Sequence, residues 1–381
     1  MVKEQIINIA SKNPEKVYPI AALNERGFKR KQCKICKRYF WSIENRETCA
    51  DHEPYSFIGK PIKPIEYKKL WDLTKKFFSE RGYVPLNSYP VVARWRDDLD
   101  FVIASIVDFQ PHIVNGEIEP IANRIIIPQY CLRFDDLPLV GYSGRHFTSF
   151  IMIGQHAFEK PENYNPYKYL RDLLDYFNYL GFKDNQLVIH EDAWAGGGNA
   201  GPSLEIFYTG LELANQVYMV YKVIDNKLIP MENIRVLDMG AGHERIVWAL
   251  NGSINAYEVT FPNSLKYLRN YFDLDREIKD IYYLGYKIES KDDIINVAKE
   301  YAENFGFDLD YVLKAWEEYA KMYIVADHLR SVYLAIKDGM LPSNTGGGYN
   351  IRILLRRVFK IMEEKGFEIE KVIELIQKDL L

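Results

Sequence analysis

The sequence predicts an α+β fold, in which an antiparallel sheet flanked by helices is followed by an all-α region. Short runs rich in Val, Ile, Phe and Tyr accumulate between residue 61 and about residue 262, and few helical segments separate them. From about residue 263 onward, apolar residues instead recur at helical spacing. A doubly wound parallel sheet requires strands that alternate with helices, so this order favours an antiparallel core with helices appended.

These changes of pattern divide the chain into three regions: an N-terminal extension over residues 1–60, an α+β region over 61–262 and a helical region over 263–381. An amphipathic helix is expected near Glu66 to Arg81. The runs with the length and composition of strands are VVARW, DFVIASIVDF, RIIIPQYCLRF, TSFIMIG, QLVIHED, SLEIFYTG, ANQVYMVYK and IRVLDMG. Further helices are expected over Asp308–Ile324, Ala326–Lys337 and Ile351–Lys365.

Composition places the chain among folded proteins, because 48% of its 381 residues are apolar and 14% are aromatic. No apolar run approaches the roughly 20 residues that span a bilayer, and the N-terminus has no signal-peptide pattern. We therefore expect a cytoplasmic protein without a membrane partner. The net charge is −4, so a nucleic-acid partner would be held by local basic patches and not by a globally positive field.

Three of the four cysteines lie close together in the extension. Cys33, Cys36, Cys49 and His52 form two pairs with two-residue gaps, and a Cys3His set suits tetrahedral Zn²⁺. The alternatives are a reduced, metal-free knuckle, or a Cys49 that pairs with a residue other than His52. The basic run Lys29 to Lys31 and its aromatic neighbours could contact RNA or form an ordinary solvated face.

The stretch VLDMGAGHER, from Val236 to Arg245, allows two interpretations. A strand that ends in Asp and Gly-x-Gly is typical of Rossmann-type methyltransferases, and Glu258 lies 20 residues after Asp238, where such a fold places a ribose-binding acid. That fold would continue with alternating strands and helices, whereas the remaining chain has the pattern of helices. The second interpretation starts from GxGxER, which resembles motif 3 of class II aminoacyl-tRNA synthetases.

Other motifs of that class follow in the right order. QYCLRFDDL with VGYSGRHFTSF resembles motif 2, in which a strand arginine, a loop and a returning strand grip ATP. WAGGGNAGPSLEI with GLELA resembles a segment of archaeal-type alanyl-tRNA synthetases, and LPSN with GYN and RR is similar to their helical tRNA-acceptor domain. This resemblance covers nearly the whole chain. It implies a class II synthetase fold that uses ATP and Mg²⁺ to activate L-alanine and transfers the alanyl group to tRNA(Ala).

The resemblance gives the ATP site its residues. Arg133 would contact the α-phosphate and the substrate carboxylate, Arg245 the distal phosphates, and Phe150 would stack on adenine. A guanidinium fork matches phosphate oxygens, and a ring offers a flat face to a base. Without the motifs, these arginines would be read as surface ion-pair residues and Phe150 as core. The further ATP-binding candidates are Asp136, Glu205, Gly240 and Gly242.

The resemblance assigns Asp238 to the α-ammonium group of alanine, in a pocket that Gly240 and Gly242 keep small. Such a pocket discriminates weakly against glycine and serine, because a methyl group or an added hydroxyl is worth only a few kcal/mol. The family therefore carries an editing domain with metal-binding His and Cys motifs; none of the seven histidines here forms an H-x3-H pair, so no editing site is expected in this chain. Glu205 and Glu212 are candidates for magnesium or ammonium contacts, or are structural.

For tRNA, the resemblance places a base-edge contact at Asn344. Arg352, Arg356 and Arg357 recur at helical spacing and suit phosphates, unless they form only the charged outer face of a helix. The family's editing and C-terminal domains come later than Leu381, so the sequence is either a shortened piece or a subunit that needs a second chain. In the latter case KVIELIQKDLL would be a docking helix. A catalytically idle, synthetase-like RNA-binding or regulatory protein is the alternative function.

Overall fold

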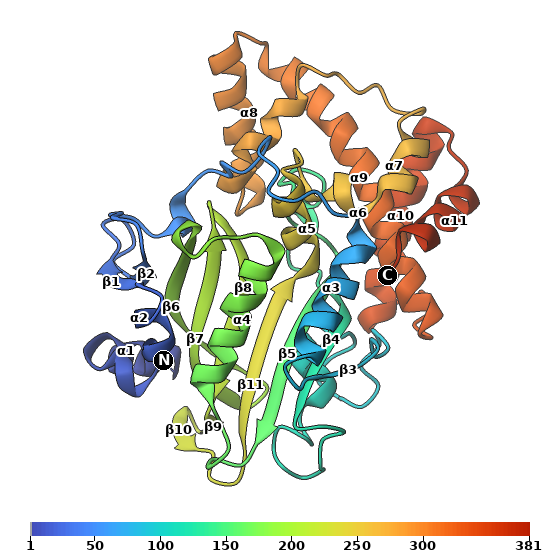
Figure 1. Ribbon diagram of the computed structural model, residues 1–381. Helices are drawn as coiled ribbons and strands as arrows, with labels where there is room; N and C mark the ends of the chain where they lie inside the picture. The colour runs from blue at the N-terminus through green and yellow to red at the C-terminus, as the bar shows by residue number, and fades with distance from the viewer. Residues whose placement is uncertain (1) are drawn as a thin grey trace.

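The computed structural model describes residues 2–381, and its centre is one mixed sheet of eleven strands (Figure 1). The strand order is β1-β2-β6-β7-β8-β11-β5-β4-β3, with the β9–β10 hairpin attached to β7. Every pair is antiparallel except β3 with β4, so the predicted antiparallel core is confirmed. The strands are β1 (Lys29–Gln32), β2 (Tyr39–Ser42), β3 (Val84–Pro85), β4 (Arg124–Leu132), β5 (Ser149–Glu159), β6 (Leu187–Gly196), β7 (Asn199–Tyr208), β8 (Leu211–Met219), β9 (Tyr221–Ile224), β10 (Lys227–Pro230) and β11 (Arg235–Gly242).

Alternation along β11 separates the two faces of the sheet. Leu237, Met239 and Ala241 join the main apolar core, under α3 (Tyr67–Ser79), α4 (Pro166–Leu180) and α5 (His243–Asn251). Helices α3 and α4 cross the front of the sheet in Figure 1. Asp238 and the glycines beside it point to the opposite face. Because successive side chains of β11 alternate between the two faces, one face of the strand packs in the core and the other is free to line a site.

The opposite face is covered by the short 3₁₀ helix η3 (Ser105–Phe109), and not by another strand. Ile106 and Phe109 pack there against Phe158 and Val236. The expectation that VVARW and DFVIASIVDF form strands was wrong, since these runs contribute only one isolated bridge, Val92 with Phe101. Most of their apolar residues are buried, with Ile103 as an exposed exception. A short apolar run has the same composition whether it is buried in a strand or in a helical turn.

The region after the sheet is helical, as predicted. Its elements are α6 (Ala256–Thr260), α7 (Pro262–Leu268), η6 (Lys279–Lys287), α8 (Lys291–Phe305), α9 (Leu309–Lys337), α10 (Gly346–Lys365) and α11 (Ile369–Asp379). The two helices expected between Asp308 and Lys337 are one, α9, because no Gly or Pro interrupts them. The possible strand NAYEV is helix α6, which removes the second strand that the methyltransferase interpretation requires.

The closing segment α11 packs within this chain. Val372 and Ile376 are fully buried, and the carboxylate of Asp379 accepts hydrogen bonds from the backbone N–H groups of Asn263 and Ser264, both at 3.0 Å. Those two residues begin α7, so an acidic group caps the N-terminus of that helix. The apolar side of α11, which was considered for docking a second chain, therefore already packs against this chain.

The N-terminal extension is continuous with the sheet. It comprises α1 (Val2–Lys12), η1 (Pro14–Lys16), α2 (Ile20–Asn24), strands β1 and β2, and η2 (Ala50–His52). Strand β2 pairs with β6, and Arg30 donates two hydrogen bonds of 2.7 Å to the buried carboxylate of Glu191, which also accepts one from Trp41 Nε1. The sheet thus crosses the predicted division near residue 60, and the three-domain division stays a prediction.

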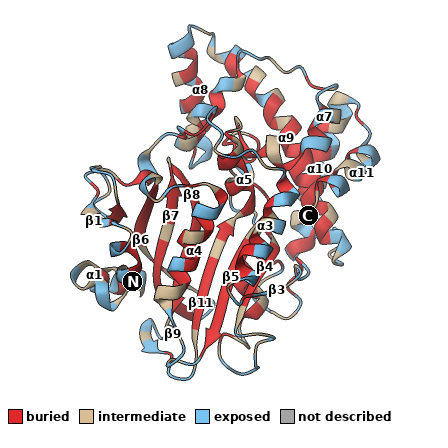
Figure 2. Cartoon of the chain, viewed as in Figure 1, coloured by how far each residue is buried: buried red, intermediate tan, exposed pale blue. Residues whose placement is uncertain are grey.

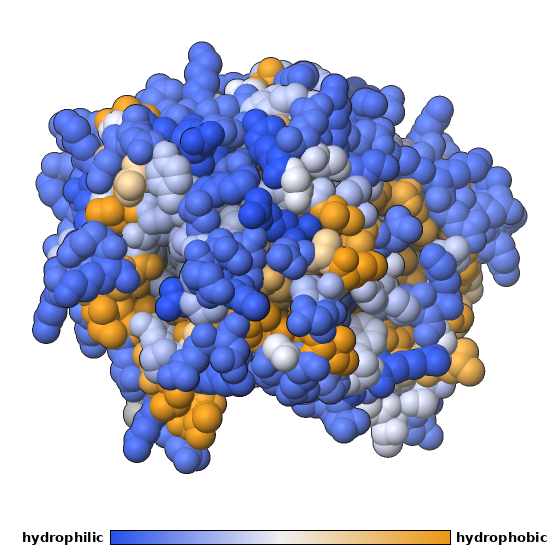
Figure 3. All heavy atoms as spheres, turned by 60° about the horizontal axis from the view of Figure 1, so that its bottom comes forward, coloured by the Kyte–Doolittle hydropathy of each residue, from blue (hydrophilic) through white to orange (hydrophobic). Residues whose placement is uncertain are grey.

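Burial follows this architecture: Figure 2 shows buried residues along the strands, and exposed ones on α1 and on the outer sides of α8 and α11. The two remaining short helices are η4 (Leu137–Leu139) and η5 (Asp184–Gln186). In Figure 3 the end that bears β9 and β10 comes forward, and its surface is largely hydrophilic with apolar side chains in separate groups. Within residues 2–381, no helix combines the length and apolar character needed to cross a membrane.

Candidate active site

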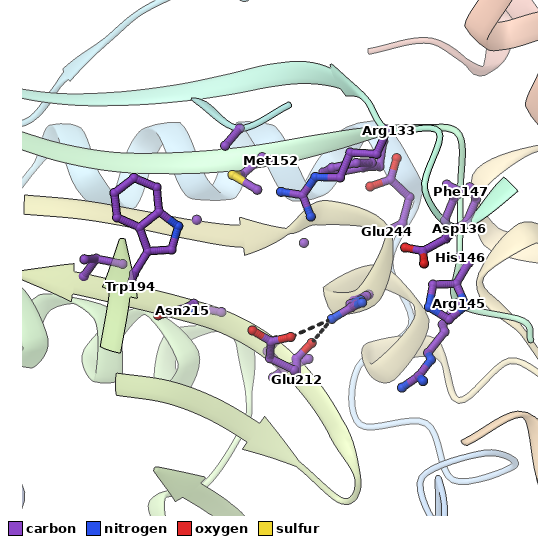
Figure 4. A pocket seen from close by; sticks show the side chains of 18 of the residues that line it. Arg133, Asp136, Arg145, His146, Phe147, Met152, Trp194, Glu212, Asn215 and Glu244 are labelled. Atoms are coloured by element: carbon purple, nitrogen blue, oxygen red, sulfur yellow. Dashed lines mark hydrogen bonds and ion pairs between the residues drawn. The ribbon is translucent and has the colours of Figure 1, made fainter. Parts of the chain in front are cut away.

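A pocket of about 330 Å³ lies on the sheet face opposite α3 and α4, over strands β5, β8 and β11 (Figure 4). In Figure 4, Trp194, Met152 and Asn215 lie at one end, and Asp136, Arg145 and His146 at the other. The lining residues are Ala104, Arg133, Asp136, Arg145, His146, Phe147, Phe150, Met152, Trp194, Glu212, Leu213, Ala214, Asn215, Val217, Asp238, Gly240, Gly242, Glu244 and Arg245. The pocket is therefore elongated, with chemically different ends.

The structure brings together most of the residues singled out from the sequence. Eight of them line this pocket: Arg133, Asp136, Phe150, Glu212, Asp238, Gly240, Gly242 and Arg245. Glu205 does not line it, because it lies on β7, one strand away from the pocket residue Asn215, and accepts a 3.0 Å hydrogen bond from His190. Glu212 lines the pocket instead. The ATP-binding role of Glu205 remains a prediction that its position does not favour.

Three arginines gather at one end of the pocket. Arg133 donates from Nε to the carbonyl of Ile103 at 2.8 Å, and its guanidinium lies 4.9 Å from the ring centre of Phe150. Arg245 donates to the carboxylate and the carbonyl of Glu212, both at 3.1 Å, and dashed lines mark these bonds in Figure 4. The third is Arg145. Such an end suits an anion with several oxygens, such as a chain of phosphates.

The pKa of His146 reflects the positive charge of these arginines. Burial, together with the nearby Arg145 and Arg245, lowers the pKa of His146 to about 2. The imidazole is therefore neutral at physiological pH, and it hydrogen-bonds Ser143 Oγ at 2.8 Å. The positive charge of this end is thus carried by the arginines alone.

The other end holds one buried acid in a small space. Asp238 is 8% exposed, and burial raises its pKa to about 7. A Cβ added at Gly240 would lie 2.6 Å from Sδ of Met152, so any larger residue there would collide with the pocket floor. Trp194, Asn215 and Val217 complete this end without charge. A small cationic group is the ligand that would relieve the buried carboxylate.

Several lining residues had no role in the sequence interpretation. Arg145 and His146 lie inside the stretch that resembles motif 2, and Trp194 begins the WAGGGNAGPSLEI segment, so the motifs contained them without indicating that they face the pocket. Glu244 is the acid of GxGxER, so that motif also contained it without giving it a role, and it begins helix α5. Asn215 had no such signal beyond its neighbours, and its side chain reaches the pocket through the sheet register, which composition does not reveal.

Glu244 connects the pocket to the helical region. Arg330, from the middle of α9, is 2% exposed and donates to Glu244 at 3.1 Å and to Ser149 Oγ at 2.9 Å. Glu244 also accepts from the hydroxyl of Tyr67 at 2.8 Å and from the backbone N–H of Ile151 at 3.1 Å. Ser149 and Ile151 flank Phe150. A buried ion pair therefore fixes the strand that presents the pocket's aromatic ring.

The tRNA-binding candidates separate into two groups. Asn344 is exposed and its side-chain oxygen accepts a hydrogen bond from Arg352, while Arg356 is exposed at the same helix, α10. Arg357 points inward, with Nη1 3.4 Å from the carbonyl of Leu137 in η4, and so links α10 to the α+β region. The positions of Asn344, Arg352 and Arg356 leave them accessible to a ligand, and all four assignments remain predictions.

The cysteine cluster has the geometry of a metal site. One ligand atom from each of Cys33, Cys36, Cys49 and His52 lies within 4.8 Å of the others, and the sulfurs of Cys36 and Cys49 are 3.7 Å apart. That separation is too long for a disulfide and close to the spacing of two thiolates on one tetrahedral zinc ion. The residues therefore fit Zn²⁺.

Neighbouring basic residues are largely engaged within the chain. Lys34 pairs with Glu47 at 2.5 Å, Lys31 donates to the carbonyl of Glu44 at 2.5 Å, and Arg38 lies 3.7 Å from Asp192. Arg30, Lys34 and Arg38 therefore have carboxylate partners, whereas Lys31 and Lys37 donate to backbone carbonyls and keep their positive charge. Both the RNA contact and the solvated face therefore remain predictions.

We expect about one zinc ion per purified chain, measured by atomic emission, and its loss in Cys36→Ser. Because the knuckle packs on Val188 of β6 and Phe207 of β7, metal removal should also lower the melting temperature. Cys131→Ala is the matched control, since Cys131 is buried in the sheet outside the cluster and should leave the zinc content unchanged. Zinc contents that do not differ between Cys36→Ser and the parent chain would contradict the assignment.

Comparison with known proteins agrees with this geometry. The family model described as tRNA synthetases class II (A) matches residues 75–380. Relatives named alanine–tRNA ligase are similar over most of the chain: the protein of Methanocella arvoryzae is 42% identical over 373 residues, that of Cenarchaeum symbiosum 39% over 389 and that of Nitrosopumilus maritimus 41% over 372. These matches cover 94%, 98% and 94% of this chain but only 43%, 43% and 41% of the relatives, so the chain spans less than half of their length. The chain belongs to the class II tRNA synthetases.

Proposed function

We propose that this chain activates L-alanine with ATP and transfers the alanyl group to tRNA(Ala). The observation that carries the proposal is the joining, in one pocket, of a small end with the single buried acid Asp238 to an end with Arg133, Arg145 and Arg245. The relatives named alanine–tRNA ligase support the choice of amino acid. An acid for the ammonium and arginines for phosphates are the two sets of partners that the activation reaction needs.

In the proposed activation step, a carboxylate oxygen of alanine attacks the α-phosphorus of ATP, alanyl-adenylate forms and pyrophosphate leaves. Arg133 would hold the α-phosphate beside the incoming carboxylate, and Arg245 would hold the distal phosphates. Phe150 would stack on adenine. Asp238 would hold the ammonium group and so aim the carboxylate along the pocket. A ribose hydroxyl of the bound tRNA would then attack the carbonyl carbon and release AMP.

Magnesium would supply further positive charge to the phosphates. The carboxylate oxygens of Glu212 and Asp136 fit such a hard cation and line the phosphate end, although Glu212 also pairs with Arg245. Zinc would belong to the knuckle of Cys33, Cys36, Cys49 and His52, where four protein ligands leave no position for substrate. Its proposed role is therefore structural.

For tRNA(Ala), the proposal uses Asn344 for a base edge and Arg352 and Arg356 for phosphates. Reading a base would require Asn344 to release its contact with Arg352. A second chain that carries editing and C-terminal domains, and a cytoplasmic location, remain predictions of the sequence.

The direct test is alanine-dependent exchange of pyrophosphate into ATP by the purified chain. Exchange with alanine that exceeds exchange with glycine and serine supports activation, and aminoacylation of tRNA(Ala) then tests the transfer step. No exchange by a folded chain supplied with Mg²⁺ and Zn²⁺ would instead favour an idle, RNA-binding protein.

The pKa of Asp238 makes a prediction about pH. Burial raises this pKa to about 7, and only the ionised carboxylate attracts an ammonium group, so kcat/KM for alanine should level off above about pH 7.5. Below pH 7 it should fall roughly tenfold per pH unit, as the carboxyl group takes up a proton. The measurement is the pH profile of exchange at saturating ATP. A flat profile from about pH 5.5 to 8.5 would contradict the role of Asp238.

A further inference from the structure

Behind Asp238 lies a buried pair of side chains, Ser105 and His156, to which nothing so far assigns a role. His156 is the cross-strand partner of Asp238, on β5 opposite β11, and both it and Ser105 are fully buried. Its Nε2 lies 3.0 Å from Ser105 Oγ. Its Nδ1 lies 3.5 Å from Oδ1 of Asp238 and, within residues 2–381, has no hydrogen-bond partner. An unsatisfied buried nitrogen thus faces the carboxylate from the side away from the pocket.

The surroundings determine which nitrogen carries the proton. Burial lowers the pKa of His156 to about 3, so the ring is neutral and has a single N–H. A proton on Nε2 would leave two acceptors, Nδ1 and the carboxylate, facing each other in a buried space. With the proton on Nδ1, the Ser105 hydroxyl donates to Nε2 and an N–H points toward Asp238. When Asp238 is ionised, the second tautomer is therefore the stable one.

The residues around Ser105 and His156 leave room for their hydrogen bond. A Cβ at Gly154 would overlap both His156 Nε2 and Ser105 Oγ, so the glycine makes room for their hydrogen bond. The Phe109 ring packs 5.4 Å from the imidazole, and the backbone N–H of Ser105 lies 3.4 Å from Sδ of Met152 in the pocket floor. Two residues earlier, the carbonyl of Ile103 holds Arg133. One short segment therefore supports both ends of the pocket.

We propose that His156 is a positioning residue for Asp238: its Nδ1–H, fixed by Ser105, bonds to the carboxylate and keeps it ionised and aimed at the ammonium group of the substrate. The inference rests on the proposed function of Asp238. A hydrogen bond to the charged form of an acid favours that form. The 3.5 Å separation closes to a normal hydrogen bond with a movement of about half an ångström.

The other elements around Asp238 offer no competing charge. Strand β8 presents Val217, its cross-strand partner, and Asn215, neither of which titrates. The segment before α4 contributes Tyr164, whose pKa burial raises well above 10, so that it stays neutral. His156 is thus the titratable side chain closest to the carboxylate, and its own protonation lies well below physiological pH.

Two substitutions separate the roles of the two nitrogens. In His156→Asn the amide nitrogen replaces Nδ1, whereas in His156→Gln it replaces Nε2 and the donor toward Asp238 is lost. We expect His156→Gln to raise the KM for alanine about tenfold or more, because a bond to a charged group is lost, and to leave the KM for ATP within about twofold. His156→Asn should stay within about threefold for both substrates. Ser105→Ala should raise the KM for alanine more weakly, in the same direction.

A structural role alone would give a different result. If His156→Gln and His156→Asn change both KM values equally, or lower only the melting temperature, the proposal is overturned. If neither histidine variant folds, Ser105→Ala decides, and an unchanged KM for alanine in that variant overturns it.

A second measurement does not depend on activity. In chains labelled with ¹³C at the aspartate carboxyl, with Asp238→Asn used to assign the signal, the pKa of Asp238 should be higher in His156→Gln than in the parent chain. Equal values overturn the positioning role. Absence of alanine-dependent exchange in the parent chain would count against the proposed function, while this titration would still decide whether His156 acts on Asp238.

Discussion

Asp238→Asn should reduce kcat/KM for alanine in the exchange assay by about 30-fold or more. The change preserves the shape of the side chain and removes its charge, and losing one partner of a buried charge pair costs about 2–5 kcal/mol, with tenfold for every 1.4 kcal/mol. The KM for ATP should change little, because the arginines that face the phosphates are untouched. Exchange should be measured at saturating ATP over a range of alanine concentrations.

Asp108→Asn is the matched control for this substitution. Asp108 lies in η3 beneath the same face of the sheet, its two carboxyl oxygens are buried without a partner in the part of the chain described, and burial raises its pKa well above the ordinary value. Asp108 does not line the pocket, so changing it to an amide removes no charge that faces the substrate. Activity close to that of the parent chain is expected. Equal losses in the two variants would show that any buried aspartate on this face matters, and would remove the specific role of Asp238.

Arg330→Met should destabilise the protein by about 3–5 kcal/mol, because it leaves the carboxylate of Glu244 buried without its positive partner. The double variant Arg330→Met/Glu244→Gln should recover part of that loss, since it buries no unpaired charge. Chemical unfolding followed by circular dichroism measures both. The KM for ATP should also rise in Arg330→Met, because Arg330 and Glu244 hold the residues on either side of Phe150.

Lys371→Met provides the comparison for an exposed ion pair. Lys371 and Glu374 are 2.8 Å apart on α11, with 45% and 62% of their side chains exposed, so solvent screens the pair. Its loss should change stability far less than Arg330→Met does. Equal destabilisation by Lys371→Met and Arg330→Met would show that the burial of Arg330 contributes nothing.

Six of the eight runs expected as strands form strands, because the composition that indicates them is local. The composition of IRVLDMG indicated a strand, and the resemblance of separate motifs joined Asp238 and Gly240 to Arg133 and Arg245. Glu205 and Glu212 show the limit of such reasoning. Both lie in strands near the pocket, but only the sheet register, with its irregularity between Ile206 and Phe207, decides which one reaches the pocket.

The parts that could not be predicted depend on contacts between distant segments. In the sequence, Arg330 resembles any charged residue of a long helix. Nothing in the sequence shows that Arg330 pairs with Glu244, which lies 86 residues earlier. Ser105 lies in a run whose composition suggested a strand, so its approach to His156 was hidden by the wrong secondary structure. Buried polar pairs of this kind are specified by three-dimensional packing, and they cannot be predicted from the propensities of single residues.

The two ends of the main strand order are free edges, and both are poorly suited to recruiting another strand. At one edge, β3 has only two residues and one is Pro85, which lacks an N–H to donate. At the other, the outermost strand is β1, whose four residues are Lys29, Arg30, Lys31 and Gln32. Charged residues on an edge strand oppose intermolecular pairing and the aggregation that follows it. The basic run that suggested an RNA contact would then oppose pairing of this edge with another chain. Removing the extension would expose β6, with Val188 and Ile189, as a new apolar edge strand that is far more prone to aggregation.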